Sequence, residues 1–149
     1  MSELNLKVGD KAPDFEVKST SGSTARLNDY LGKKVVLYFY PKDDTPGCTI
    51  EACAFRDDYG KIKDAGGEVI GVSIDDIESH NAFRSKYNLN FPLFSDTEKE
   101  VSRKYGVLGT DRSSRATFVI DKEGKIAEIF PKVDPNGHSE AVLSVLNRI

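Results

Sequence analysis

The chain has 149 residues, the size of one ordinary domain that can bury a core without disulfides or metals. Its charge is mildly acidic, with 21 Lys and Arg against 24 Asp and Glu, and the lack of a basic block argues against a nucleic-acid partner. No apolar stretch reaches the roughly 20 residues of a membrane span, and the opening MSELNLKVGDKAPDF is too polar for a signal peptide. We therefore expect a single cytoplasmic domain over residues 1–149 with no membrane partner.

Strands and helices are expected to alternate along the first half of the chain. The run KVVLYFY at residues 34–40 is apolar and rich in β-branched and aromatic residues, which is typical of a strand covered on both faces. A helical pattern follows from Pro46 to Lys63 and ends at the glycine pair 66–67. A second strand and a second helix are predicted over residues 68–74 and 76–87.

The second half of the chain continues the pattern. A short strand is predicted at residues 91–94 and a helix at 98–105. The segments 116–121 and 125–130 flank a short glycine-bearing turn, so they should form an antiparallel hairpin. A last helix is expected over residues 139–146. Together these elements predict an α/β domain with a central mixed β-sheet flanked by helices.

Both cysteines lie in PKDDTPGCTIEAC, residues 41–53, where they are spaced as C-x4-C. Thr45 and Pro46 are residue types preferred at the N-cap and the first position of a helix, which places Cys48 in the first turn. The free backbone N–H groups and the positive end of the helix dipole favour a thiolate over a thiol there. Cys48 is therefore placed to be a nucleophile. A cysteine on a helix is also often only a small buried hydrophobe, and for Cys53 that is the simpler interpretation.

The five-residue spacing has a geometric consequence. In a regular helix Cys53 lies about 140° around the axis from Cys48, and the two Cα atoms are roughly 8.6 Å apart. A disulfide requires a Cα separation below about 7 Å. The two sulfurs can therefore join only if the helix opens or shifts.

Other residue types bear on the chemistry of the same stretch. Glu51 suits the positive start of a helix, but a carboxylate disfavours a neighbouring thiolate, so a cation should offset it; spacing cannot choose among the seven arginines. His80 and His138 are expected to be surface residues at helix starts. A cysteine–histidine hydrolase would need one of them beside Cys48, and this alternative stays open. Two cysteines without clustered histidines fall short of a zinc site.

The cysteine stretch resembles the active site of a known family. Pro41, Thr45 and Cys48 match the pattern P-x-x-x-T-x-x-C of the peroxiredoxins, and PGCTIEACAFRD is similar to the PrxQ class, also called bacterioferritin comigratory proteins. The segments GDKAPDFEV, FPLFSD and RATFVIDKEGKI extend the likeness over nearly the whole chain. The resemblance implies a thioredoxin-like fold and an antioxidant enzyme that reduces hydrogen peroxide and organic hydroperoxides.

The resemblance implies roles for six residues: Cys48 as the peroxidatic cysteine, Cys53 as the resolving cysteine, Thr45 and Arg115 as groups that hold the peroxide, Pro41 as a shield of the pocket, and Glu51 as an acid that orients the arginine. Cys48 would become a sulfenic acid, and Cys53 would condense with it to an intramolecular disulfide. A thioredoxin-type dithiol would reduce that disulfide. No metal, haem or flavin cofactor is implied.

The resemblance also favours a monomer, because the chain has no third cysteine and no extended tail for a disulfide between subunits. Two other functions stay open. One is a thiol–disulfide oxidoreductase on the same fold, although such proteins usually carry C-x-x-C. The other is a redox sensor or interaction module without enzymatic activity, whose disulfide would reshape the helix. Peroxide turnover would distinguish a peroxidase from both.

Overall fold

A seven-stranded mixed sheet forms the centre of the computed structural model, which describes residues 6–110 and 112–149. The elements, in chain order, are β1 (Glu16–Ser19), β2 (Thr24–Arg26), the short 3-10 helix η1 (Leu27–Tyr30), β3 (Lys34–Phe39), α1 (Pro46–Asp64), β4 (Gly67–Ser73), α2 (Ile77–Tyr87), β5 (Leu93–Ser95), α3 (Glu100–Lys104), β6 (Ala116–Ile120), β7 (Ile126–Phe130) and α4 (His138–Leu146). The strand order is β2-β1-β5-β4-β3-β6-β7, with β5, β4 and β3 parallel and the flanking strands antiparallel to their neighbours. The predicted mixed sheet flanked by helices is confirmed.

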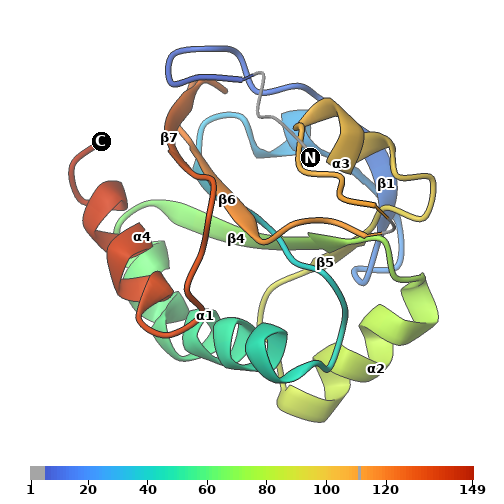
Figure 1. Ribbon diagram of the computed structural model, residues 1–149. Coiled ribbons are helices and arrows are strands. Elements are labelled where there is room, and N and C mark those ends of the chain that lie inside the picture. The colour runs from blue at the N-terminus through green and yellow to red at the C-terminus, as the bar shows by residue number, and fades with distance from the viewer. Residues whose placement is uncertain (1–5, 111) are drawn as a thin grey trace.

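Helices cover both faces of the sheet, with α1, α2 and α4 on one side and α3 on the other (Figure 1). The packing of the central strand β3 on both faces explains why its sequence is apolar throughout. Val35, Leu37 and Phe39 pack into the core on the α3 side, while Val36 and Tyr38 pack into the core beneath α1. The period-two alternation of a strand thus places apolar side chains in two cores.

Helix α1 begins at Pro46 as predicted and ends at Asp64, one residue beyond the predicted Lys63. Its buried face includes Cys48, Ala52, Phe55 and Ile62, which recur at helical spacing and pack against the sheet. Gly66 has a φ of +85°, a conformation that glycine adopts without strain, and it turns the chain from the helix into β4. The β3–α1–β4 unit therefore follows directly from the local sequence.

Other boundaries differ from the predictions. Strand β5 begins two residues later than expected. Helix α3 is shorter than the predicted 98–105, because Lys99 has a left-handed backbone with a φ of +61° and the Asp96 carboxylate accepts hydrogen bonds from the N–H groups of Val101 and Ser102. Strands β1 and β2 and helix η1 were not predicted, because each has four residues or fewer and mixes exposed and buried positions. In the part of the chain that the structure describes, no helix could cross a membrane.

Candidate active site

Cys48 lies in the first turn of α1, directly after the loop that leaves the carboxyl end of β3. Thr45 holds the N-cap position with an extended backbone, and Pro46 is the first helical residue, as predicted. The Cys48 side chain packs against the core and the residue is only 1 % exposed. Its sulfur therefore combines burial with the positive end of a helix of 19 residues.

Thr45 differs from the prediction in one respect. Its hydroxyl makes no hydrogen bond to the N–H groups of the first turn, and it donates instead to the carbonyl oxygen of Lys42 at 2.9 Å. The backbone of Thr45 still begins the helix, because its carbonyl accepts the N–H of Thr49 at 2.8 Å. The side chain is thus an element of the loop before α1 rather than a helix cap.

Arg115 is the cation that approaches Cys48. It immediately precedes β6, whose first residue, Ala116, pairs with Phe39 at the end of β3, so the sheet register brings Arg115 to the start of α1. One guanidinium nitrogen, Nη2, lies 3.3 Å from Cys48 Sγ, and the other, Nη1, lies 2.8 Å from Oε1 of Glu51. Burial lowers the pKa of Arg115, but Cys48 and Glu51 outweigh burial and leave it raised, so the guanidinium stays charged.

Glu51 is buried beneath this arginine with one carboxylate oxygen unused. Oε1 binds Arg115, whereas Oε2 has no hydrogen-bond partner among the described residues. Burial raises the pKa of Glu51 to about 7, although the positive charge of Arg115 acts in the opposite direction. Glu51 can therefore gain or lose a proton near neutral pH, one helical turn from Cys48.

The remaining two residues singled out from the sequence precede and follow Cys48 in the chain. Pro41 is half-buried and follows β3 in the loop that leads to α1. Cys53 is half-buried on α1, and both cysteines are free thiols. Because α1 runs without interruption from Pro46 to Asp64, the helix keeps the regular form in which Cys48 and Cys53 cannot bond.

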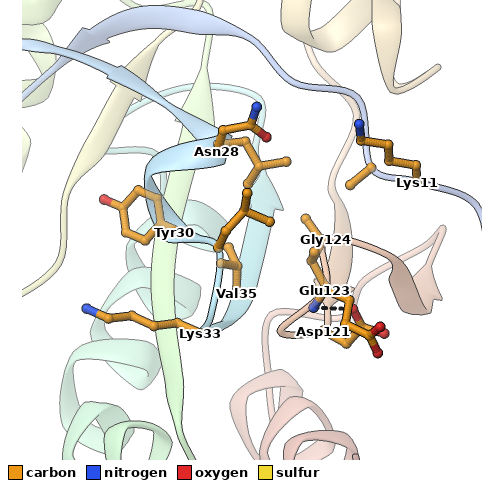
Figure 2. Close-up of a pocket in the computed structure, with 12 residues that line it drawn as sticks. Lys11, Asn28, Tyr30, Lys33, Val35, Asp121, Glu123 and Gly124 are labelled. Carbon is orange, nitrogen blue, oxygen red and sulfur yellow. Dashed lines mark hydrogen bonds between the residues drawn. The ribbon is translucent and has the colours of Figure 1, made fainter.

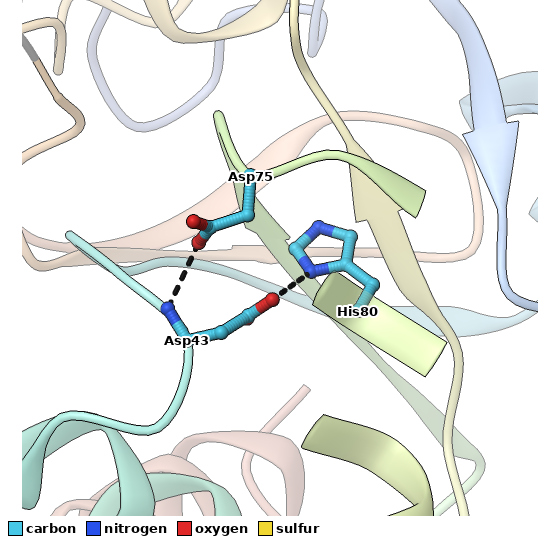
Figure 3. A group of neighbouring side chains, drawn as sticks. All are labelled: Asp43, Asp75 and His80. Carbon is cyan, nitrogen blue, oxygen red and sulfur yellow. Dashed lines mark hydrogen bonds and ion pairs between the residues drawn. The ribbon is translucent and has the colours of Figure 1, made fainter. Parts of the chain in front are cut away.

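A buried polar cluster fixes the loop before α1 (Figure 3). The Asp43 carboxylate contacts the hydroxyls of Tyr40 and Ser79 and, at 2.7 Å, Nδ1 of His80. The backbone N–H of Asp43 donates to Oδ2 of Asp75 at 2.8 Å. Asp43, Asp75 and His80 offer possible metal-ligand atoms within 4.8 Å of one another, but hydrogen bonds already use these atoms. Asp43 is not among the residues predicted for the site, and its only signal in the sequence is its place in the cysteine stretch.

Both histidines are buried, so the expectation that they lie on the surface was wrong. The ring of His80 bonds Asp43 through Nδ1 and the Phe94 carbonyl through Nε2 at 2.9 Å. His138 Nε2 lies 2.8 Å from the hydroxyl of Thr117, and its ring packs edge-on to Phe130. The start of a helix can face the sheet as well as solvent, and here both histidines face inward. Neither histidine hydrogen-bonds Cys48 among the described residues, so the geometry does not support a cysteine–histidine hydrolase.

A separate cavity of about 180 Å³ lies at the other end of β3 (Figure 2). Its lining includes Lys33 and Val35, at the amino end of β3, and Asp121, just after β6. Lys11 and Tyr30 also line it. Six strand residues at about 3.3 Å each separate this end from the loop that leads to Cys48, a distance of roughly 20 Å. The cavity is therefore distinct from the cysteine site.

Residues 8–129 match the AhpC/TSA family. The chain therefore belongs to this family. Among solved structures, PrxQ of Xylella fastidiosa superposes with a TM-score of 0.93 at 29 % identity over 98 % of each chain. Peroxidoxin BcpB of Mycobacterium tuberculosis gives 0.89 at 33 % identity over 97 % of this chain and 99 % of its own. The thioredoxin-like fold of the peroxiredoxins is thereby confirmed.

Curated relatives define the class more closely. Peroxiredoxin Bcp of Bacillus subtilis is 41 % identical over 96 % of both chains. The chloroplastic peroxiredoxin Q of Triticum aestivum is 45 % identical over 95 % of this chain and 67 % of its own length. Within the family the chain is accordingly a peroxiredoxin of the Bcp and peroxiredoxin Q class, a thiol-dependent peroxidase.

Proposed function

We propose that the chain reduces hydrogen peroxide and organic hydroperoxides with Cys48 as the peroxidatic cysteine. The observation that carries this assignment is the 3.3 Å approach of Arg115 Nη2 to Cys48 Sγ at the start of a long helix. A guanidinium and the amino end of a helix both stabilise negative charge on sulfur. In the part of the chain that the structure describes, no cation hydrogen-bonds the Cys53 sulfur, which makes Cys53 the weaker candidate for attack on peroxide.

In the first step the Cys48 thiolate attacks the terminal oxygen of the peroxide. A sulfur–oxygen bond forms, the oxygen–oxygen bond breaks, and the leaving oxygen departs with a proton as water or an alcohol. Arg115 stabilises the negative charge that develops on the oxygens, and the hydroxyl of Thr45 supplies a second donor once the peroxide is bound. Pro41 restricts access of water to the sulfur, and Glu51 holds Arg115 in place through its 2.8 Å ion pair.

In the second step Cys53 attacks the sulfur of the Cys48 sulfenic acid. The sulfur–sulfur bond forms, the sulfur–oxygen bond breaks, and the oxygen leaves as water. This disulfide requires the first turns of α1 to open, because the regular helix holds the sulfurs apart. A thioredoxin-type dithiol then restores both thiols by exchange, which makes the chain an atypical two-cysteine peroxidase.

We further infer a cytoplasmic monomer with neither a nucleic-acid nor a membrane partner. Support comes from the mildly acidic, mixed charge of the sequence and from the location of both cysteines on one helix of one chain. Sedimentation of the oxidised and reduced forms tests the oligomeric state. A stable disulfide-linked dimer would contradict the intramolecular cycle.

The decisive experiment measures peroxide consumption with a thioredoxin system in the parent and in two single variants. Cys48→Ser should abolish reaction with peroxide. Cys53→Ser should consume one equivalent of peroxide and then turn over poorly, because the sulfenic acid lacks its partner. Parental rates in Cys48→Ser would show that the assignment of the two cysteines is wrong.

A further inference from the structure

Tyr87, the last residue of α2, binds both ends of the segment that carries the two cysteines. Its hydroxyl donates to Oδ1 of Asp44 at 2.8 Å, just before α1 begins. Its backbone carbonyl accepts a hydrogen bond from Nη1 of Arg56 at 2.7 Å, three residues beyond Cys53. The stretch 45–55 therefore lies between two attachments to the same residue of a neighbouring helix.

Each attachment has a supporting contact from α2 or the loop after it. Lys86 Nζ lies 2.7 Å from Oδ2 of Asp44, so the carboxylate is bound through both oxygens. The Asn90 amide donates to the Arg56 carbonyl at 3.2 Å. Asp44 also has a left-handed backbone with a φ of +60°, which a residue with a side chain adopts less readily than glycine. The side-chain contacts of Asp44 therefore help to hold the turn before α1.

Between the two attachments, the side chains of residues 45–55 make contacts with other parts of the chain. Cys48, Ala52 and Phe55 pack into the core. Among the described residues, Thr45 donates a side-chain hydrogen bond to the Lys42 carbonyl, and Cys48 and Glu51 accept hydrogen bonds from Arg115. Beyond Arg56, by contrast, α1 is tied to other elements, since Asp58 accepts from Ser139 at 2.7 Å on α4 and Tyr59 donates to Glu68 at 2.6 Å on β4. The two attachments to Tyr87 thus lie at the two ends of the part of α1 that contains both cysteines.

We propose that Tyr87 is a positioning residue that sets how readily residues 45–55 open. It thereby sets whether the Cys48 sulfenic acid becomes a disulfide or a sulfinic acid. This inference rests on the proposed function. In the open segment Cys53 attacks the sulfenic sulfur, a disulfide forms, and the oxygen leaves as water. In the closed segment a second peroxide transfers one oxygen to the same sulfur, which gives the sulfinic acid and releases water or an alcohol. Tighter attachment to Tyr87 favours the second outcome.

Tyr87→Phe tests this role, because it removes the hydroxyl contact with Asp44 and keeps both the ring and the backbone carbonyl. Tyr59→Phe is a matched control. It removes another tyrosine–carboxylate contact from α1, but one that lies beyond residues 45–55. Hydrogen exchange of the reduced proteins should be about 3- to 10-fold faster over residues 46–55 in Tyr87→Phe and parental there in Tyr59→Phe. Lys86→Met, at an exposed site, should act in the same direction as Tyr87→Phe.

The chemical readout is the ratio of disulfide to sulfinic acid after a fixed dose of peroxide, measured by mass spectrometry. Tyr87→Phe should raise this ratio by the factor seen in hydrogen exchange, and Tyr59→Phe should leave it unchanged. Parental exchange over 46–55 in both Tyr87→Phe and Lys86→Met, or an equal ratio in Tyr87→Phe and Tyr59→Phe, would overturn the proposal. Hydrogen exchange is measured without peroxide, so it tests the attachment to Tyr87 independently of the reaction. If Tyr87→Phe exchanges faster over residues 46–55 but the parent consumes no peroxide, the proposed function is wrong and the role of Tyr87 in holding the helix is not.

Discussion

The guanidinium of Arg115 lies directly against Gly47, the residue before Cys48. A Cβ at residue 47 would stand 3.0 Å from Nη2 of Arg115, closer than side-chain contacts normally allow. The same nitrogen lies 3.3 Å from Cys48 Sγ, so the missing side chain leaves the space through which the arginine reaches the sulfur. Gly47 lies in the helix without a left-handed backbone, and its value here is this close approach.

Gly47→Ala should therefore slow the reaction of Cys48 with peroxide by about 3- to 10-fold while leaving the protein at least as stable. The methyl group displaces Arg115 by a few tenths of an ångström, whereas alanine is the better helix former. Gly60→Ala is the matched control, because it lies in the same helix with no atom within 4 Å of the added Cβ. It should raise the melting temperature and leave the rate unchanged. Equal rates in all three proteins would show that the position of Arg115 is not limiting.

Arg115→Lys should reduce the rate constant for peroxide by at least about 100-fold. The guanidinium serves Cys48 and Glu51 with two separate nitrogens, and a lysine can approach only one of them at a time. The chain has no tryptophan, so quenched-flow mass spectrometry of Cys48 is a suitable measurement. Arg103→Lys, at an exposed position on α3, is the control and should react at the parental rate. A small effect of Arg115→Lys would mean that a single positive charge is sufficient and that the simultaneous contact with Cys48 and Glu51 is not required.

The β3–α1–β4 unit and the place of Cys48 were predictable, because they depend on hydrophobic periodicity and on helix-start residues within a short stretch. The contact between Arg115 and Cys48 was not predictable from spacing, since 67 residues separate the two. It depends on the antiparallel register of β6 on β3, which only the folded sheet fixes. Arg115 could be named from the sequence only through the family resemblance, because its place in the motif RATFVID matches that of the arginine in the family.

The histidines show a different limit of sequence reasoning. A polar residue at a helix start predicts exposure when the opposite face of the helix is apolar, yet His80 and His138 face the sheet. His80 is accommodated there by Asp43, which comes from a distant loop, and His138 by Thr117 on β6. Burial of a polar side chain depends on partners that appear only when separate segments meet.

Thr45→Val should leave the stability of the protein within about 0.5 kcal/mol of the parent, whereas loss of a capping hydroxyl typically costs about 1 kcal/mol. The reason is that the Thr45 hydroxyl bonds the Lys42 carbonyl and makes no bond to the first-turn N–H groups. Peroxide reduction should nevertheless fall by about 10-fold or more, because the proposed contact with peroxide is lost. Thr45→Ser keeps a hydroxyl and should restore most of the rate. A rate in Thr45→Val equal to that of the parent would remove Thr45 from the peroxide site.

Burial in the folded chain shifts the pKa values of Glu51 and His138 in opposite directions. Burial raises the pKa of Glu51 from 4.5 to about 7, so the folded state holds a proton that the unfolded state has lost, and stability falls as pH rises through this window. Burial, aided by the charge of Arg115, lowers the pKa of His138 from 6.5 to about 4. The unfolded state then holds the extra proton, and stability rises with pH through that window. Between about pH 4.5 and 6.5 the two effects oppose each other.

Replacing either group should remove its own contribution to the pH dependence of stability. Relative to the parent, Glu51→Gln should gain stability as pH rises from 4.5 to 7, and His138→Gln should lose stability as pH rises from 4 to 6.5. Each difference is on the order of 3 kcal/mol across its window. Urea unfolding at half-unit pH intervals measures both slopes, and because each variant is compared with the parent, the other titrating groups cancel. Slopes of the same sign in the two variants would contradict the assignment of opposite proton binding to these buried neighbours of Arg115.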